Sequence, residues 1–455
     1  MVASGCDDGD SPAGDPLALE PLTDTNPDPS IVEVELVAAI STMEYLSGKR
    51  ADTWGYRDGA RAGSTTTTPG PLLDIPLGAH VIVHFRNELP EPTTVHWHGL
   101  LVPNTSDGTP VAQMAVPPGG SYEYQFDATD SGLFWYHPHV NADVQIERGL
   151  YAPLVVRGGV EPSVSADRIF VLDDVKLEST GKLSTTNEPL DIMLGRQGNV
   201  LLVNGRAKAE LDVAARTRER WRFVNAANGR FFNLALPGHT FLVIGWDGGP
   251  LVTPYVTETL LVAPGERYEV LVEFAGEPGT SVVLQTLHYD RGHNIPDPGP
   301  RDLLAVRIGT HGEPPAALPT TWGEFAPLAV DGATPVRRLV LSEEEAGLAE
   351  PRFMINGVQH PAPISGVAGD VEIWEIENSA AMDHPFHLHG MFFQVLDVDG
   401  VAPSNLGWKD TVNVPLQKTV RFAVRYGEPG RWMFHCHILE HAERGMMGEL
   451  ALQSR

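Results

Sequence analysis

The sequence is poor in cysteine, in basic residues and in long apolar runs. Its 455 residues hold two cysteines, Cys6 and Cys436, which excludes a scaffold built on several disulfides. Its 32 Lys and Arg stand against 59 Asp and Glu, a formal net charge of −27, which argues against a nucleic-acid-binding protein. No stretch of about 18 or more apolar residues occurs, so the sequence as given predicts no membrane-spanning helix.

Proline and glycine, by contrast, are frequent, with 38 and 46 residues. Short runs such as 31–36 alternate apolar and polar residues at period 2, whereas long amphipathic helical patterns are scarce. We therefore expect an all-β protein made of sandwiches. A chain of this length predicts about two to four domains.

The most unusual stretch lies near the C-terminus, where His435-Cys436-His437 is followed by His441 and Met446. No rule of packing or turn formation requires a cysteine between two histidines. A thiolate, two imidazoles and a distant thioether are the ligands of a blue-copper electron-transfer site. If 431–437 is a strand, His435 and His437 face one side and Cys436 faces the other, so that one strand serves two metal sites.

Three further His-x-His pairs could complete the second of these sites: His96 with His98, His137 with His139, and His387 with His389. With 17 histidines in 455 residues, chance gives roughly 0.6 such pairs, whereas this chain has four. Each pair can project both rings from one face of an extended segment. The four pairs together predict a multinuclear metal cluster.

The motifs that carry these residues resemble the four copper-binding motifs of the multicopper oxidases, in order and in grouping: His96-Trp97-His98-Gly99, Trp135-Tyr136-His137-Pro138-His139, His384-Pro385-Phe386-His387-Leu388-His389-Gly390 and the Cys436 stretch. The resemblance covers nearly the whole chain after residue 30 and is closest to the three-domain bacterial laccases. It implies three consecutive cupredoxin-like Greek-key β-sandwich domains and four copper ions. The implied activity couples one-electron substrate oxidation to the four-electron reduction of dioxygen to water.

The resemblance also implies a role for each ligand. The type 1 copper would be bound by His384, Cys436, His441 and Met446. The type 2 copper would be bound by His96 and His387, and the type 3 pair by His98, His137, His139, His389, His435 and His437. The path from Cys436 to His435 and His437 would carry electrons from the first site to the cluster.

We expect domain 1 over 31–158, with type 2 and type 3 ligands, and domain 2 over 163–310, a spacer without ligands. A linker over 311–336 would lead to domain 3 over 337–455, which holds the type 1 site and the remaining ligands. Residues 1–30 hold seven Asp or Glu and no Lys or Arg, which predicts a flexible acidic tether. Domains 1 and 3 would build the cluster between them.

The ten methionines are scattered, and no Met-rich insertion of the kind expected for a cuprous oxidase is present. This distribution favours laccase-like oxidation of phenols and aromatic amines. Oxidation of Cu(I) or Fe(II) in metal tolerance is the alternative. A copper-binding relative without catalysis is disfavoured because all the ligands are retained, and nitrite reduction is disfavoured because it requires no type 3 pair.

Two acids bear on proton delivery. Asp107 follows His98 by nine residues, where similar oxidases keep a carboxylate beside the cluster, and is our candidate catalytic acid. The alternative for Asp107-Gly108 is an ordinary turn. Directly after His441, where many bacterial members carry a second acid, this chain has Ala442 and then Glu443. That departure leaves the proton route open.

The seven remaining histidines match no ligand motif, and we expect them at the surface or in loops: His80, His84, His239, His288, His293, His311 and His360. Cys6, which follows Ala3-Ser4-Gly5, is a candidate lipid anchor, with a cysteine of no function as the alternative. We expect an exported monomer, periplasmic or extracellular, whose partners are dioxygen and small electron donors.

Overall fold

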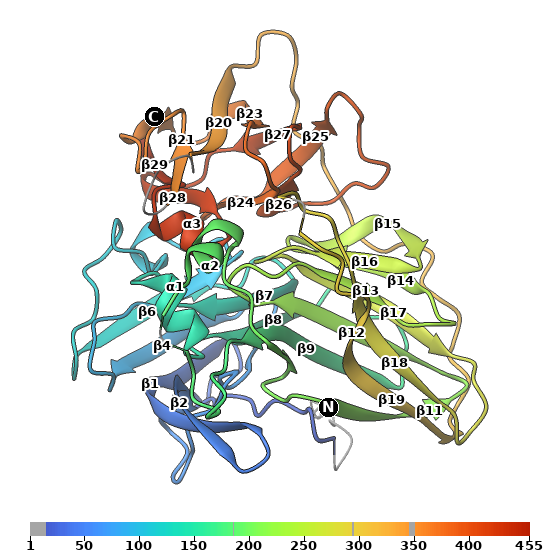
Figure 1. Ribbon diagram of the computed structural model, residues 1–455. Helices are drawn as coiled ribbons and strands as arrows, with labels where there is room; N and C mark the ends of the chain where they lie inside the picture. Colours follow the sequence, from blue (N-terminus) through green and yellow to red (C-terminus); the bar gives the residue numbers. More distant parts are fainter. Residues whose placement is uncertain (1–14, 185, 294, 345–350) are drawn as a thin grey trace.

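Six β-sheets pair into three sandwiches that follow one another along the chain (Figure 1). The computed structural model describes residues 15–184, 186–293, 295–344 and 351–455. We call the units sandwich 1 (β1–β8), sandwich 2 (β9–β19) and sandwich 3 (β20–β29). They confirm the predicted all-β fold of three consecutive sandwich domains.

Sandwich 1 pairs a sheet in the order β2-β1-β4-β6 with a sheet in the order β3-β8-β7-β5. The alternating run at 31–36 lies in β1, which pairs in parallel with β4. Its elements are β1 (Ile31–Leu46), β2 (Lys49–Asp58), β3 (Leu73–Pro76), β4 (His80–Asn87), β5 (His96–His98), η1 (Asn104–Ser106), β6 (Ser121–Asp127), β7 (Gly132–His137), α1 (Ala142–Glu147) and β8 (Ala152–Arg157).

Sandwich 2 pairs a six-stranded sheet, β10-β9-β12-β17-β14-β15, with a five-stranded sheet, β11-β19-β18-β13-β16. Its elements are β9 (Ala166–Val175), α2 (Pro189–Leu194), β10 (Val200–Val203), β11 (Ala209–Ala215), β12 (Thr217–Asn225), β13 (Phe232–Ala235), β14 (Phe241–Trp246), β15 (Gly249–Thr257), β16 (Thr259–Val262), β17 (Arg267–Phe274), β18 (Ser281–Leu287) and β19 (Arg301–His311).

Sandwich 3 pairs a sheet in the order β21-β20-β23-β27-β25 with a sheet in the order β22-β29-β28-β24-β26. Its elements are β20 (Val336–Glu344), β21 (Arg352–Ile355), β22 (Ile364–Val367), β23 (Val371–Asn378), β24 (His384–Leu388), β25 (Phe393–Val398), β26 (Thr411–Val414), β27 (Thr419–Arg425), β28 (Gly430–Cys436), α3 (Leu439–Glu443) and β29 (Met447–Gln453).

The three sandwiches repeat one topology. In each, the first strand pairs in parallel with a later one: β1 with β4, β9 with β12 and β20 with β23. The strands β5, β13 and β24 hold equivalent places in the second sheets. β5 and β24 carry histidine motifs, whereas β13 has the sequence Phe232-Asn233-Leu234-Ala235. Sandwich 2 thus keeps the frame of the other two and lacks their ligand residues.

The expected tether over 1–30 is wrong for residues 15–30. Leu17 is buried in the core of sandwich 2, and Leu22 is buried in that of sandwich 1. Asp15 also forms an ion pair with the buried Arg168. The acidic composition predicts a tether, but burial of Leu17 and Leu22 stabilises each by about 1.5–3 kcal/mol and holds this segment on the two cores. The rest of the expected tether, including Cys6, lies outside the described residues.

A mixed core joins the three sandwiches. Leu133 and Trp135 of sandwich 1 pack there with Val224 of sandwich 2 and with Leu439 of sandwich 3. Between β19 and β20 the chain runs over sandwich 2, where Trp322 is buried beside Ile244. Among the described residues, no helix has the length and apolar character required to cross a membrane.

Candidate metal centres

The histidine pairs are brought together by strand pairing at the boundary between sandwiches 1 and 3. In sandwich 1, β5 pairs with β7, so that His96 lies opposite His137. In sandwich 3, β24 pairs with β28, so that His387 lies opposite His435. Because side chains alternate along a strand, both members of each pair face the boundary.

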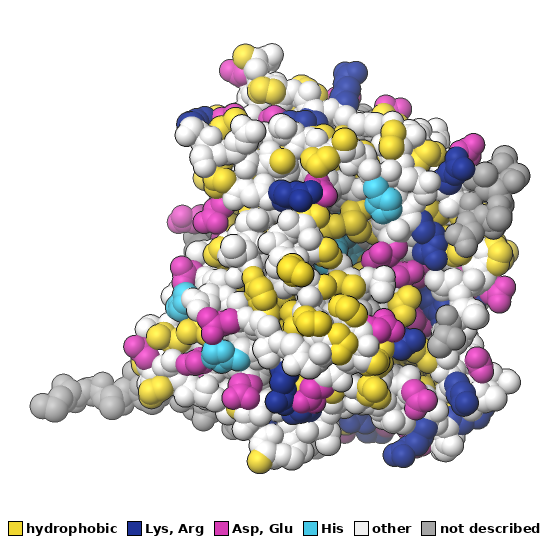
Figure 2. Space-filling view, turned by 90° about the vertical axis from the view of Figure 1, so that its left-hand side faces the viewer, with side chains coloured by type: hydrophobic (Ala, Val, Ile, Leu, Met, Phe, Trp, Pro, Cys, Tyr) yellow, Lys and Arg dark blue, Asp and Glu magenta, His cyan; other side chains and the backbone are white. Residues whose placement is uncertain are grey.

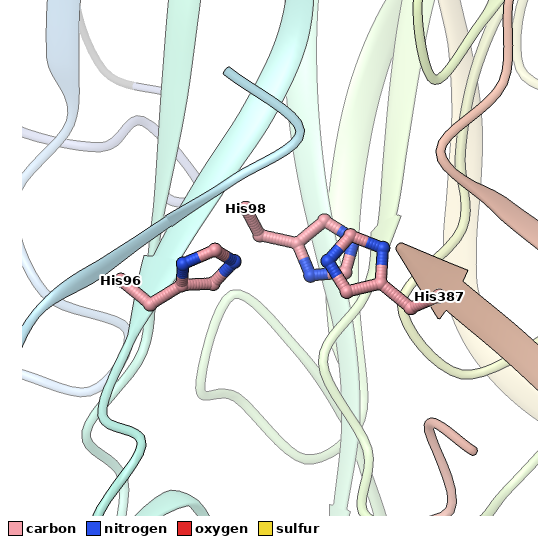
Figure 3. Close-up of side chains that lie close together, drawn as sticks. All are labelled: His96, His98 and His387. Atoms are coloured by element: carbon pink, nitrogen blue, oxygen red, sulfur yellow. The ribbon is translucent and has the colours of Figure 1, made fainter. Parts of the chain in front are cut away.

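Eight buried histidines form one cluster there, four from each sandwich: His96, His98, His137 and His139 with His387, His389, His435 and His437. They fall into overlapping groups of three whose ring nitrogens lie within 4.8 Å of one another. The rings of His98 and His387 stack at 3.8 Å, and His96 faces them (Figure 3).

Outer hydrogen bonds fix which ring nitrogens face inward. Nδ1 of His96 lies 2.7 Å from the carbonyl oxygen of Asp107, and Nδ1 of His387 lies 2.9 Å from that of Asp410. Nδ1 of His435 lies 2.8 Å from the carbonyl oxygen of Cys436. A nitrogen beside a carbonyl oxygen carries the proton, so Nε2 of each ring presents a lone pair to the interior.

Several of the inward nitrogens have no proton donor. Among the described residues, Nε2 of His96 and Nε2 of His387 have no hydrogen-bond partner. Nε2 of His389 lies 3.2 Å from Nε2 of His435, although both rings turn their Nδ1 toward oxygen acceptors. Buried polar atoms normally find partners, and two lone pairs at this distance repel each other. A bound cation removes both costs, so the donor set fits a metal cluster.

Electrostatics keep the cluster in its metal-binding form. Burial, reinforced by neighbouring histidines, lowers the pKa of His98, His137, His139, His389 and His437 well below the ordinary value of imidazole. The same causes lower the pKa of His435 to about 3. Neutral imidazole is the form that binds a metal, and here it is present at neutral pH.

A second, smaller site lies in sandwich 3. Sγ of Cys436 lies 3.4 Å from Nδ1 of His384 and 3.9 Å from Nδ1 of His441, and these two nitrogens are 3.2 Å apart. All three residues are buried. Burial raises the pKa of the Cys436 thiol, so a metal must displace its proton before the thiolate can bind. One sulfur and two nitrogens fit a copper site.

Met446 adjoins this site. It is fully buried, and its carbonyl oxygen accepts the N–H of Cys436 at 3.0 Å. Met447 is partly exposed and begins β29. Of these two adjacent methionines, the buried one is Met446, which the resemblance implies as the axial ligand.

Strand β28 joins the two sites. His435 groups with His387 and His389, His437 groups with His98 and His137, and Cys436 groups with His384 and His441. One peptide unit therefore separates the thiol from a histidine of the cluster on either side. This is the arrangement that the alternation of side chains predicts.

The structure places Asp107 at the cluster. Both of its carboxylate oxygens lie 3.2 Å from Nδ1 of His389, and one accepts the hydroxyl of Thr109 at 2.9 Å. It is a buried acid that orients two histidines, because its carbonyl oxygen also accepts from His96. Glu443 lies against the start of helix α1, where its carboxylate accepts the N–H of Ala142. Burial raises the pKa of Glu443 to about 7.

Three residues beside the cluster were not predicted from the sequence to belong to the site. Asp410 and Thr411 lie against His98 and His387, and Arg267 of sandwich 2 pairs with Asp410. The charged pair Lys409-Asp410 inside a run that resembles a strand was the available signal. A charged pair of this kind is also ordinary at a strand edge, so the sequence alone does not single it out.

Among the histidines outside the motifs, His80 and His84 pair with acids on exposed strands, as expected for surface residues. His293 lies in a loop but is largely buried, with its Nε2 3.0 Å from the carboxylate of Glu343. That pair adjoins the smaller site, because Glu343 also accepts the N–H of Ala381, three residues before His384.

Comparison with known proteins defines the class. Segments 53–160, 173–296 and 339–454 match three families described as multicopper oxidase. The chain belongs to the multicopper oxidases, copper-dependent oxidoreductases that use dioxygen.

Among individual relatives, multicopper oxidase MmcO of Mycobacterium tuberculosis is 32% identical over 429 residues, which cover 84% of this chain and 81% of the relative. A laccase of Bacillus subtilis is 27% identical over 87% of this chain and 89% of its own. A multicopper oxidase of Campylobacter jejuni described as a metallo-oxidase superposes with a TM-score of 0.85 at 27% identity, covering 96% and 94% of the two chains. A laccase of Pediococcus acidilactici gives 0.84 at 30% identity, covering 96% and 93%.

The unpartnered nitrogens generate a prediction about stability. Removing copper with a chelator and a reductant is expected to lower the midpoint of thermal unfolding, because binding that is specific to the folded state contributes about 2.7 kcal/mol at 100-fold excess over Kd. Calorimetry before and after restoring Cu(II) measures the difference. Equal midpoints for the two forms would contradict a metal role for the cluster.

Proposed function

We propose that the chain is a laccase-like oxidase with four coppers. His384, Cys436, His441 and Met446 bind the type 1 copper, and His96 and His387 bind the type 2 copper. The type 3 pair is bound by His98, His137 and His437 on one side and by His139, His389 and His435 on the other, a division that agrees with the close ring contacts within each set. The observation that carries the proposal is the segment 435–437 at the end of β28, in which Cys436 lies between two histidines of the cluster.

When bound, these coppers accept electrons singly at the thiolate site and reduce dioxygen by four electrons at the cluster. The residues of the chain hold these sites apart. His435 at the end of β28 and His437 directly after it face the cluster, while the ring of His441 stacks on Phe353 at 3.8 Å. The residues that would bind the type 1 copper and those that would bind the cluster therefore lie on opposite sides of the segment 435–437.

The covering of His441 favours an aromatic donor. Nε2 of His441 lies 3.1 Å from the carbonyl oxygen of Met193 in helix α2. The same helix exposes Leu190, with 63% of its surface accessible. Figure 2 shows one face of the molecule, turned by 90° from the view of Figure 1, on which hydrophobic side chains gather with acidic ones around them. A neutral phenol or aromatic amine suits an apolar approach of this kind better than a hydrated cation does.

One observation favours the second candidate, oxidation of Fe(II) or Cu(I). Glu343 Oε1 is held by His293 and by the Ala381 N–H, whereas Oε2 is buried and has no hydrogen-bond partner within the described ranges. Although burial alone would raise the pKa of Glu343, the hydrogen bond with His293 holds it below its ordinary value. A carboxylate and an imidazole beside His384 are ligands for a divalent cation such as Fe(II).

We propose further that the protein is exported and acts as a monomer. Export agrees with the laccase-like substrates and with the acidic surface. Cys6, the candidate lipid anchor, lies outside the described residues.

Oxygen uptake distinguishes the two donors. We expect the parent protein to consume dioxygen with a substituted phenol faster than with Fe(II) or Cu(I), and Cys436→Ser to lose the blue colour and all uptake. If Fe(II) is the true donor, Glu343→Gln raises the KM for Fe(II) by about tenfold or more. Its exposed neighbour supplies the control, Glu344→Gln, which should leave both donors unchanged. A Cys436→Ser protein that is still blue contradicts the type 1 assignment.

The axial ligand is tested at two adjacent methionines. Replacing the buried thioether in Met446→Leu should raise the reduction potential of the type 1 copper. The axial thioether, although a weak ligand, stabilises Cu(II) relative to Cu(I), so its removal favours reduction. Met447→Leu, at the partly exposed neighbour, is the matched control and should change the potential little. Redox titration of the blue band gives both values, and the opposite pattern would assign Met447.

Asp107 is tested by separating the half-reactions. Asp107→Asn removes the negative charge that orients His389 while keeping the size of the side chain. We expect reduction of the blue centre by substrate at the parent rate, and reoxidation by dioxygen slower by about 10²-fold or more, the typical loss on removing a positioned acid or base. Stopped-flow traces of bleaching and recovery report the two steps. Recovery at the parent rate at every pH would leave Asp107 as a turn residue.

A further inference from the structure

The charged side chain of Arg267, at the start of β17 in sandwich 2, extends to Asp410 beside the cluster. Its side chain has 0% exposure. Burying a guanidinium is costly unless every donor is paired, so its presence in this place requires an explanation. From the sequence, sandwich 2 is expected to be only a spacer without ligand residues.

All five N–H groups of Arg267 are accepted, and the acceptors come from all three sandwiches. Nε donates to the carbonyl oxygen of Leu133 in sandwich 1 at 3.1 Å. Within sandwich 2 the carbonyl oxygens of Gly265 and Asp247 accept at 3.3 and 3.0 Å. The two remaining donors form a fork on the carboxylate of Asp410 in sandwich 3, at 2.7 and 2.6 Å.

Asp410 passes this contact on to the cluster. Its Oδ1 lies 3.2 Å from Nε2 of His98 and accepts the hydroxyl of Thr411 at 2.8 Å. The same oxygen lies 3.5 Å from Nδ1 of His387. In His98 the proton is on Nε2, which faces these acceptors, so Nδ1 presents its lone pair to the interior. In His387 the proton is on Nδ1, so Nε2 presents its lone pair to the interior.

The fit around Arg267 leaves little freedom. A Cβ on Gly99, which follows His98, would lie 2.3 Å from Nη2 of Arg267 and 2.7 Å from Oδ2 of Asp410. A Cβ on Gly265 would lie 2.7 Å from the ring of His437. Both glycines also have positive φ, which other residues adopt at a cost. Sandwich 2 therefore touches the cluster twice, at His437 and through Asp410.

A second set of charges balances the site. Asp247, whose carbonyl oxygen accepts from Arg267, turns its carboxylate to Lys409 Nζ at 2.9 Å, and Glu266 faces the same Nζ at 3.1 Å. Two buried cations thus meet three buried carboxylates, with His98 and His387 as further donors to Asp410. The carboxylate of Asp410 is left to Arg267, Thr411 and the two histidines.

We propose that Arg267 is a positioning residue for the trinuclear site, one that holds Asp410 in the orientation that fixes His98 and His387 for copper. The inference rests on the proposed copper assignment and adds a contribution from sandwich 2. The group acts through Asp410 and does not touch the metal.

The test uses Arg267→Lys in the full-length, copper-loaded protein. Lysine keeps the charge and loses the fork, so we expect the type 2 copper to be removed by a chelator about 10–100-fold more readily, the usual cost of disturbing such a partner. Its EPR hyperfine splitting should change, while the blue absorption from Cys436 is retained. The matched control is Arg222→Lys, at a side chain with 1% exposure in the same sheet, whose ion pairs are with Asp167 and Glu269.

The proposal is overturned if the type 2 signals and chelator resistance of Arg267→Lys equal those of the parent, or if both arginine variants show equal losses and the blue band falls as well. A double-mutant cycle adds an independent readout, because in an Asp410→Asn background Arg267→Lys should add little, and full additivity contradicts action through Asp410. If Arg267→Lys does not fold, Asp410→Asn alone decides, since type 2 copper retained as in the parent overturns the inference. A parent protein without type 2 copper would instead refute the proposed function.

Discussion

The structure depends on one constraint, the burial of eight uncharged imidazoles whose lone pairs converge. Sandwiches 1 and 3 each supply four of these rings, and the complete set of eight forms only where the two sandwiches meet. In the absence of a cation, nitrogens such as Nε2 of His389 and Nε2 of His435 at 3.2 Å repel each other and lack the hydrogen bonds of water. Metal binding is therefore coupled to the docking of the two sandwiches, since the ligand set exists only in the docked state.

The meeting of the histidines and Cys436 in two sites could be predicted from the sequence because their signal is local. A His-x-His pair on a strand presents both rings to one face whatever the surrounding fold, and the alternation through Cys436 assigns two sites from seven residues. The resemblance to a family then ordered them. The burial of residues 15–30 could not be predicted in this way, because it depends on Leu17 and Leu22 meeting two cores that form from distant strands. Charge composition describes a free chain and does not include such contacts.

The residues that support the cluster could not be predicted either, because they come together only through contacts between distant segments. Arg267, Asp410 and Leu133 are far apart in the sequence, and their meeting follows from the packing of three sandwiches. Each taken alone resembles an ordinary strand residue. The repeated topology explains how a unit without ligands can still serve the site: sandwich 2 lacks histidines at β13 but keeps the frame that places Gly265 and Arg267 against the boundary. Sandwich 2 therefore supports the geometry of the cluster in addition to separating the other two sandwiches.

The smaller site is asymmetric, and that asymmetry bears on the choice of electron donor. Nε2 of His441 faces a carbonyl oxygen of α2, beside an exposed apolar side chain, whereas His384 follows the segment that is held by Glu343. Electron transfer to a buried copper requires only that a donor approach the edge of one ligand ring, so the ligands themselves do not select between a phenol and a metal ion. The residues beside the two rings differ, since α2 of sandwich 2 approaches His441 whereas Glu343 of β20 in sandwich 3 holds the segment before His384. Under the proposed function, changes in α2 or in β20 would therefore alter the choice of donor in this chain without any change in the residues that would bind copper.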